Sequence, residues 1–215
     1  MRGSAKEPLR AFRAPVRASA TTVRADAVAG GGAGSGAPVP AYRRILLVGF
    51  MGSGKSTVGP PLASRLGWRH VDLDEEIERR VGCPIPRIFH EDGEEVFRVL
   101  EEEVGQEVLG LDRVVITPGG GWPCREGRME GLDPATLTIW LQVSPEAAVE
   151  RTVRQDVERP LLTGADPLAR ARDLLSGRER YYALARWQID TESRSAADVV
   201  RIVTEQLTRE PGRPP

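Results

Sequence analysis

Short apolar runs alternate along the chain with longer amphipathic segments. The run ILLVG at 45–49 is continuously apolar up to its glycine, which is typical of a parallel strand buried on both faces. Further strands are predicted at 70–73, 113–117, 137–143 and 187–190. Helices are predicted at 55–66, 74–81, 94–109, 145–154, 167–184 and 196–207. This alternation predicts an α/β fold with a five-stranded parallel sheet flanked by helices.

Residues 1–41 lack this periodicity and end in a glycine-rich run at 30–40. We expect them to form a disordered basic extension and a flexible linker, ahead of one domain over 42–208 and a disordered tail over 209–215. The extension is basic, rich in hydroxyl groups and poor in acids, as organelle transit peptides are, but a natural start further downstream would leave the same composition. A cytoplasmic location is therefore expected, with a plastid as the alternative.

Composition narrows the class of protein. The chain has 215 residues, of which 40% are hydrophobic, enough for the core of one domain. Its two cysteines and two histidines form neither a disulfide framework nor a metal-ligand spacing. No apolar run approaches the roughly 20 residues that span a bilayer, so no membrane association is expected. Beyond residue 44 the chain is mildly acidic, so we expect no nucleic-acid partner. We also expect the protein to be a monomer.

The segment GFMGSGKS at 49–56 matches the phosphate-binding pattern GxxxxGK[ST], directly after a predicted strand and before a helix. Its glycines let successive backbone N–H groups surround phosphate oxygens. Lys55 is the only lysine after residue 6, and a compact ammonium fits between the β- and γ-phosphates. The Ser56 hydroxyl is a suitable Mg²⁺ ligand. The predicted nucleotide contacts here are Gly52, Ser53, Gly54, Lys55, Ser56 and Thr57.

A phosphate-binding loop does not identify the acceptor. The guanine-reading NKxD motif is absent and the chain is too short for most motor ATPases, which favours a small kinase. Asp72 and Asp74 stand at the end of the second predicted strand, and we expect them to face opposite sides of it. One would then face the metal while the other accepts the proton of an attacking hydroxyl. An acidic helix start explains the same residues equally well.

Six segments together resemble the shikimate kinase family. They are GFMGSGKSTVG at 49–59, DLDEEIERRVG at 72–82, IPRIFHEDGEEVFRVLE at 85–101, GGG at 119–121, ERPLL at 158–162 and RERYY at 178–182. The resemblance extends over residues 44–207. It implies a P-loop fold like that of the nucleoside-monophosphate kinases, with a lid. It also implies transfer of the ATP γ-phosphoryl group to the 3-hydroxyl of shikimate, on the route to the aromatic amino acids.

The resemblance also implies roles for single residues. Asp74 would hold and deprotonate the acceptor hydroxyl, and Asp72 would lie near Mg²⁺. Arg98 and Arg178 would bind the shikimate carboxylate, since a planar guanidinium binds a carboxylate through two charge-assisted hydrogen bonds. Glu101, one turn after Arg98, would orient it.

Further roles follow from the matched glycines and the matched lid. Backbone at Gly119, Gly120 and Gly121 would approach the cyclohexene ring, where any side chain would collide. The segment at 158–162 resembles a lid that closes over ATP, with Arg159 placing a positive charge on the transferring phosphoryl group. Arg151 resembles the arginine that stacks on adenine, and Arg194 resembles a second contact to the base.

The chain departs from the family pattern beside these glycines. Pro118 precedes them, and Trp122 begins a WPC segment where the family carries small or aliphatic residues. Trp122 therefore either alters one wall of the acceptor pocket or covers apolar surface. Two other functions stay open: a different small P-loop kinase, such as a gluconate or nucleotide kinase, and a kinase-like protein without turnover. Arg98 and Arg178 favour an acceptor that carries a carboxylate.

Overall fold

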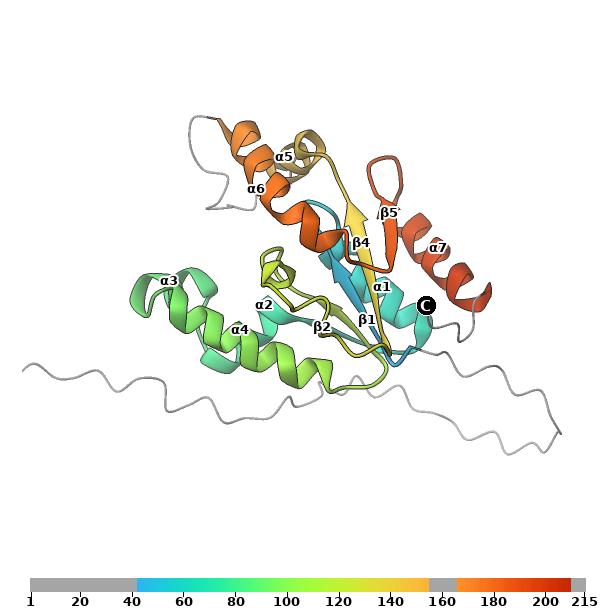
Figure 1. Ribbon diagram of the computed structural model, residues 1–215, viewed down its shortest axis with the longest axis horizontal. Helices are drawn as coiled ribbons and strands as arrows, with labels where there is room; N and C mark the ends of the chain where they lie inside the picture. Colours follow the sequence, from blue (N-terminus) through green and yellow to red (C-terminus); the bar gives the residue numbers. More distant parts are fainter. Residues whose placement is uncertain (1–41, 155–165, 210–215) are drawn as a thin grey trace, which may run out of the picture.

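The computed structural model describes residues 42–154 and 166–209. Its strands are β1 (Arg44–Val48), β2 (Arg69–Asp72), β3 (Val114–Thr117), β4 (Thr136–Gln142) and β5 (Trp187–Asp190). They form a parallel sheet in the order β2-β3-β1-β4-β5 (Figure 1). In the centre of the sheet, Leu46 pairs with Ile116 on one side and Thr138 on the other. The predicted five-stranded parallel sheet is confirmed.

Helices connect the strands and cover the sheet. They are α1 (Lys55–Leu66), α2 (Leu73–Val81), α3 (Ile85–Glu91), α4 (Glu94–Leu109), α5 (Pro145–Arg154), α6 (Pro167–Tyr182) and α7 (Ala196–Arg209), with a 3₁₀ turn η1 (Trp122–Cys124). None of the helices among the described residues is long and apolar enough to cross a membrane.

The sequence did not predict α3 and η1, and it placed some boundaries wrongly. α3 has seven residues, too few to display a helical period, and it carries a proline in its first turn, where proline is tolerated. Arg209, which the sequence had assigned to the tail, is the last residue of α7. Conversely, α6 ends at Tyr182 rather than at 184.

The two faces of the sheet bury separate sets of apolar side chains. Along β1, Leu46 and Val48 pack with residues of α2 to α6, whereas Ile45 and Leu47 pack with residues of α1 and α7. All four side chains are fully buried. Figure 1 shows α1 and α7 on one side of the sheet and α4 on the other. Burial on both faces explains why β1 is a continuous apolar run.

The carboxyl ends of all the strands meet at one edge of the sheet. The chain leaves β1 there into the phosphate-binding loop, ends β2 at Asp72, and leaves β3 into the 118–121 glycine segment. In open parallel sheets this edge is where ligands bind. The topology therefore collects residues that lie about 20 to 70 positions apart in the sequence.

Helix α1 packs closely on the sheet at Gly59. A methyl group at this position would lie 2.6 Å from Nε2 of His70 and 2.8 Å from Cγ2 of Thr117. We expect Gly59→Ala to lower the free energy of unfolding by about 1–3 kcal/mol, because overpacking outweighs the gain in helix propensity. Urea denaturation followed by circular dichroism measures this change.

Gly177→Ala is the matched control for this experiment. Gly177 also lies inside a helix, α6, but a methyl group there would have no neighbour within 4 Å. We expect this variant to raise the free energy of unfolding by about 0.5–1 kcal/mol through helix propensity alone. Equal stabilisation by both substitutions would show that α1 is not closely packed at Gly59.

Candidate active site

The phosphate-binding loop joins β1 to α1 and needs glycine at two close contacts. Gly49 and Gly52 have φ angles of 147° and 71°. Methyl groups there would lie 2.5 Å from the Leu141 carbonyl oxygen and 2.9 Å from that of Ala148. Nζ of Lys55 donates to the carbonyl oxygens of Gly49 at 2.8 Å and Phe50 at 2.9 Å, so the ammonium lies over the loop.

A small hollow of about 130 Å³, which we term the phosphate cavity, opens at this loop. Its lining residues are Met51, Gly52, Gly54, Lys55, Ser56, Thr57, Asp72, Asp74, Pro118, Gly119 and Gly120. Five of the six predicted nucleotide contacts in the loop are among them. The exception is Ser53, which is fully buried and whose N–H donates to the Phe50 carbonyl at 3.2 Å. Ser53 therefore contributes to the fold of the loop and does not face the cavity.

A helix cap places Asp72 and Asp74 differently. The strand alternation behind the expectation of opposite sides could not do so, because residues two apart in a strand point to the same side. Asp72 ends β2, and its Oδ1 accepts hydrogen bonds from the N–H groups of Asp74 at 3.0 Å and Glu75 at 3.3 Å. Its Oδ2 accepts from the Thr117 hydroxyl at 2.9 Å. Asp74 belongs to the first turn of α2. The acidic helix start and the pair of cavity-lining carboxylates are thus the same feature.

A second hollow of about 210 Å³, which we term the acceptor cavity, adjoins the first. Its lining residues are Met51, Asp74, Phe89, Phe97, Arg98, Glu101, Gly119, Gly120, Gly121 and Arg178. It contains all six residues that the sequence assigned to the acceptor, together with Glu101. Asp74 lines both cavities, as do Met51, Gly119 and Gly120. The two hollows therefore meet at Asp74.

The glycine segment after β3 brings backbone close to the charged groups of this cavity. A methyl group at Gly119 would lie 3.2 Å from Oδ1 of Asp74, and one at Gly120 would lie 3.4 Å from Nη1 of Arg178. At Gly121 it would lie 3.7 Å from Nη2 of Arg178 and 3.8 Å from Nη1 of Arg98. The two guanidinium groups thus converge beside Gly121, where a methyl group would be in van der Waals contact with both.

Tyr182 holds the glycine segment from the side of α6. Its hydroxyl donates to the Gly120 carbonyl oxygen at 2.6 Å. Burial raises the pKa of Tyr182, so the hydroxyl keeps its proton and remains a donor. Tyr182 stands in the matched RERYY segment, four residues after Arg178, but its contact with Gly120 could not be read from the sequence.

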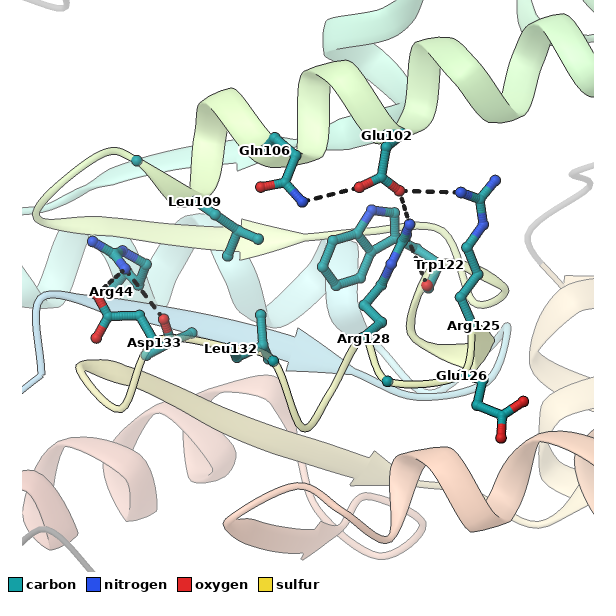
Figure 2. Close-up of a pocket in the computed structure, with 14 residues that line it drawn as sticks. Arg44, Glu102, Gln106, Leu109, Trp122, Arg125, Glu126, Arg128, Leu132 and Asp133 are labelled. Carbon is teal, nitrogen blue, oxygen red and sulfur yellow. Dashed lines mark hydrogen bonds and ion pairs between the residues drawn. The ribbon is translucent and has the colours of Figure 1, made fainter.

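Trp122 does not line the acceptor cavity. It is only 3% exposed and borders a different hollow of about 700 Å³, between α4 and the 122–136 loop (Figure 2). Of the two roles that the sequence left open, covering apolar surface is therefore the one that the structure supports. Pro118 lines the phosphate cavity.

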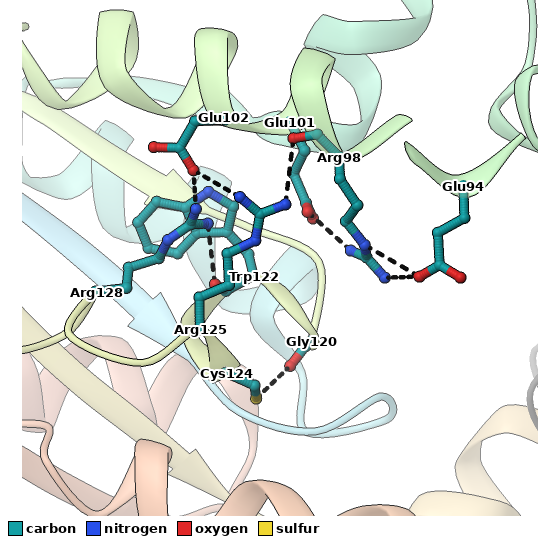
Figure 3. A network of polar contacts seen from close by, with 9 residues as sticks. All are labelled: Glu94, Arg98, Glu101, Glu102, Gly120, Trp122, Cys124, Arg125 and Arg128. Carbon is teal, nitrogen blue, oxygen red and sulfur yellow. Dashed lines mark hydrogen bonds and ion pairs between the residues drawn. The ribbon is translucent and has the colours of Figure 1, made fainter. Parts of the chain in front are cut away.

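Arg98 is oriented by two glutamates on its own helix. Its Nη1 donates to Glu101 at 2.8 Å, and its Nη2 and Nε donate to Glu94 at 3.0 Å and 3.2 Å (Figure 3). Burial alone would lower the pKa of Arg98, but the hydrogen bonds and charges of Glu101 and Glu94 raise it above its ordinary value. Glu101 is itself only 3% exposed. The predicted pairing of Glu101 with Arg98 is confirmed.

Two phenylalanines in the acceptor cavity were not predicted. Phe89 of α3 and Phe97 of α4 have ring centroids 4.7 Å apart and planes tilted by 35°. Both lie in the matched 85–101 segment, but only the turn between α3 and α4 brings the rings together. They provide an apolar part of the cavity wall, and the Phe97 ring centroid lies 5.3 Å from the guanidinium carbon of Arg98.

The predicted adenine contacts lie on the β5 side of the loop. Nη1 of Arg151 donates to the Gly52 carbonyl at 3.1 Å and to the Thr191 hydroxyl at 3.2 Å. Arg151 therefore links the phosphate-binding loop to the segment after β5. Arg194 pairs with Asp190 at 3.0 Å and lines neither cavity. Arg159 and the predicted lid at 158–162 lie outside the described residues.

Known proteins match most of the chain. The family model for shikimate kinase matches residues 51–208. The shikimate kinase of Moorella thermoacetica is 44% identical over 163 residues, which cover 76% of this chain and 93% of that protein. The solved shikimate kinase from Acinetobacter baumannii, in complex with shikimate, is 36% identical with a TM-score of 0.72, covering 78% of this chain and 94% of the other.

A gluconokinase from Sinorhizobium meliloti is more distant. It is 19% identical with a TM-score of 0.51, over 80% of this chain and 93% of its own, so it shares the fold alone. The matches cover most of the chain. They agree with the sheet order, with the phosphate-binding loop, and with the cavity that holds Asp74, Arg98 and Arg178. The chain belongs to the shikimate kinase family.

Proposed function

We propose that this kinase transfers the γ-phosphoryl group of Mg-ATP to the 3-hydroxyl of shikimate at Asp74. The observation that carries this proposal is that Asp74 lines both the phosphate cavity and the acceptor cavity. A phosphoryl donor in one hollow and a hydroxyl acceptor in the other would meet at its carboxylate. Transfer requires such a junction, because the attacking oxygen and the phosphorus must lie next to one another.

The phosphate-binding loop would hold the triphosphate. Its backbone N–H groups and the amino end of α1 favour anionic oxygens, and Lys55 would exchange its contacts with two carbonyl groups for the β- and γ-phosphates. Ser56 and Asp72 fit Mg²⁺, since both line the phosphate cavity with oxygen atoms. When bound, Mg²⁺ neutralises charge on the phosphate oxygens.

The acceptor cavity suits a small carboxylate with a partly apolar ring. Arg98 and Arg178 would bind the carboxylate through paired charge-assisted hydrogen bonds, while Phe89 and Phe97 pack against the ring. Asp74 would take the proton of the 3-hydroxyl as that oxygen bonds to the γ-phosphorus and the bond to the β,γ-bridging oxygen breaks. The products are ADP and shikimate 3-phosphate.

Three arginines would complete the nucleotide site. We assign Arg159 to the charge on the transferring phosphoryl group, and Arg151 and Arg194 to adenine, as the family resemblance implies. The hydrogen bond from Arg151 to the Gly52 carbonyl supports its place beside the nucleotide. A monomeric state stays a prediction, as does a cytoplasmic location with a plastid as its alternative. The free thiols of Cys83 and Cys124 suit a reducing compartment.

A coupled assay of ADP release across several acceptors tests the proposed reaction. Shikimate, gluconate and nucleoside monophosphates are compared at equal concentrations. We expect kcat/KM for shikimate to exceed that for the other acceptors by roughly 100-fold or more, because only shikimate pairs its carboxylate with both arginines while placing a hydroxyl at Asp74. Faster phosphorylation of gluconate or of a nucleotide would overturn the assignment.

Asp74→Asn tests the proton acceptor. Asparagine has nearly the same shape but cannot take the proton, so we expect kcat to fall by about 10²- to 10⁴-fold. The KM for ATP should change little. Asp173→Asn, an exposed position on α6, removes the same charge outside the cavities and should keep normal turnover. Normal turnover of Asp74→Asn would remove Asp74 from the reaction.

Arg98→Lys tests the binding of the carboxylate. Lysine keeps the charge but loses one of two parallel hydrogen bonds, a loss of about 1.5–3 kcal/mol. We expect the KM for shikimate to rise about 10- to 100-fold while the KM for ATP stays unchanged. The control is Arg87→Lys on α3, where an exposed arginine pairs with Glu91 at 3.0 Å. Equal KM values for the two variants would contradict the role of Arg98.

A further inference from the structure

Trp122 fits against α4 by its shape. The indole lies over Gly105, where a methyl group would come within 2.8 Å of Nε1 and 3.3 Å of Cε2. Its N–H has no hydrogen-bond partner among the described residues, although it is buried. A buried donor without a partner costs about 1–3 kcal/mol, so hydrogen bonding does not explain a tryptophan at this position. The close packing of the indole against α4 at Gly105 explains the tryptophan instead.

Arg128 covers the other side of the indole. Its guanidinium carbon lies 4.4 Å from the ring centroid, and Nη1 donates to the Trp122 carbonyl at 3.0 Å. Its Nη2 forms an ion pair with Glu102 of α4 (Figure 2). The Arg128 side chain is only 8% exposed and that of Glu102 is 37% exposed, so this ion pair is partly shielded from water. Arg128 thereby ties Trp122 to α4.

Arg125 makes a second link to the same helix. Its Nη1 donates to Glu102 at 3.1 Å, and its Nη2 lies 3.4 Å from the carbonyl oxygen of Arg98 (Figure 3). The other oxygen of Glu102 accepts from Gln106 at 2.9 Å. Glu102 is therefore held by three donors, and the 122–128 segment reaches the turn of α4 that carries Arg98.

These contacts join two walls of the acceptor cavity from outside it. One wall is α4, which carries Arg98 and Glu101, and the other is the 119–121 glycine backbone, which continues directly into Trp122. We term Glu102, Trp122, Arg125 and Arg128 the clasp. None of the four lines the acceptor cavity or the phosphate cavity. Their effect on a ligand is therefore exerted through the position of Arg98 relative to the glycines.

The adjoining hollow of about 700 Å³ is better explained by this packing than by a ligand of its own. The arginines on its lining already have acidic partners: Arg44 pairs with Asp133 at 3.4 Å, and Arg125 and Arg128 both pair with Glu102. Figure 2 shows Glu102 of α4 paired with Arg125 and Arg128 of the loop at one end of the hollow, and Arg44 of β1 paired with Asp133 at the other.

We propose that the clasp residues are positioning residues that set the affinity for shikimate by fixing Arg98 against the glycine backbone. The inference rests on the proposed role of Arg98 in binding the shikimate carboxylate. Small displacements of a bidentate partner weaken binding strongly, because both hydrogen bonds depend on direction. The phosphate-binding loop is carried by β1 and α1, whereas the hydrogen bonds and ion pairs of the clasp described above lie within the 122–128 segment or between it and α4, so we expect ATP binding to change little.

Gly105→Ala loosens the clasp without removing any of its groups. The added methyl group displaces the indole, and we expect the KM for shikimate to rise about ten- to hundredfold. The KM for ATP stays unchanged. Gly177→Ala makes the same chemical change in the middle of α6, in open space, and leaves both KM values unchanged. Equal values of the KM for shikimate in the two variants would overturn the inference.

Two further pairs keep the test decisive if Gly105→Ala folds poorly. Glu102→Gln removes the shared charge and should raise the KM for shikimate, whereas Glu103→Gln, at the exposed next position of α4, should not. Trp122→Ala should raise it further, and Trp122→Phe should restore most of the affinity, because the ring is kept and no hydrogen bond is lost. A purely structural role would instead lower stability in these variants with no selective change in the KM for shikimate.

Measuring Arg98→Lys in the same assay distinguishes the proposed role of Arg98 in binding shikimate from the proposed role of the clasp. If Arg98→Lys raises the KM for shikimate and the clasp variants do not, the clasp inference fails alone. If Arg98→Lys leaves that KM unchanged, the proposed role of Arg98 fails, and the clasp inference fails with it. If the clasp variants raise the KM for ATP as much as that for shikimate, the effect is general and the inference is overturned.

Discussion

The close approach of the 119–121 backbone to charged side chains is the contact on which the active site depends. Three consecutive residues without side chains leave room for Asp74 of α2, Arg98 of α4 and Arg178 of α6 to converge from three different helices. A methyl group at Gly119 would press on the carboxylate of Asp74, and one at Gly120 or Gly121 would already be in van der Waals contact with the guanidinium groups. The site is therefore an arrangement of helices around a bare stretch of backbone, and its precision depends on how firmly that backbone is held.

The nucleotide side and the acceptor side are built on different principles. The phosphate-binding loop is mainly local: a strand, eight residues and a helix provide its shape and its ammonium, although its close glycine contacts are with Leu141 and Ala148, far along the chain. The acceptor side is assembled from parts of the chain that lie far apart, so it needs fastening. Tyr182 fastens the glycine backbone to α6, and Trp122 with Arg128 fastens it to α4. Trp122, which departs from the family pattern, therefore acts outside the acceptor cavity, by packing the glycine segment against α4.

Charge is placed unevenly around Arg98. Glu101 is buried beside it, and Glu94 is exposed at 66% of its side chain. Exposed pairs contribute little and are screened by salt, whereas a buried partner fixes the direction of the guanidinium. Two successive residues of α4 thus hold Arg98 in different ways. Glu101 accepts a hydrogen bond from its side chain. Glu102 binds Arg125, which in turn contacts the backbone carbonyl of Arg98.

The sequence by itself determined the strands, most of the helices and the phosphate-binding loop, because apolar periodicity and short motifs are local properties of a chain. Its resemblance to a known family also singled out six residues that the structure brings into one cavity. It missed α3 and η1, which are too short to show a period, and it separated Asp72 from Asp74 by the wrong geometry. Only the tertiary structure decided that Asp74 lies where two cavities meet, that Phe89 packs on Phe97, and that Trp122 turns away from the acceptor. Those distances depend on the packing of helices on a shared sheet, which no local pattern encodes.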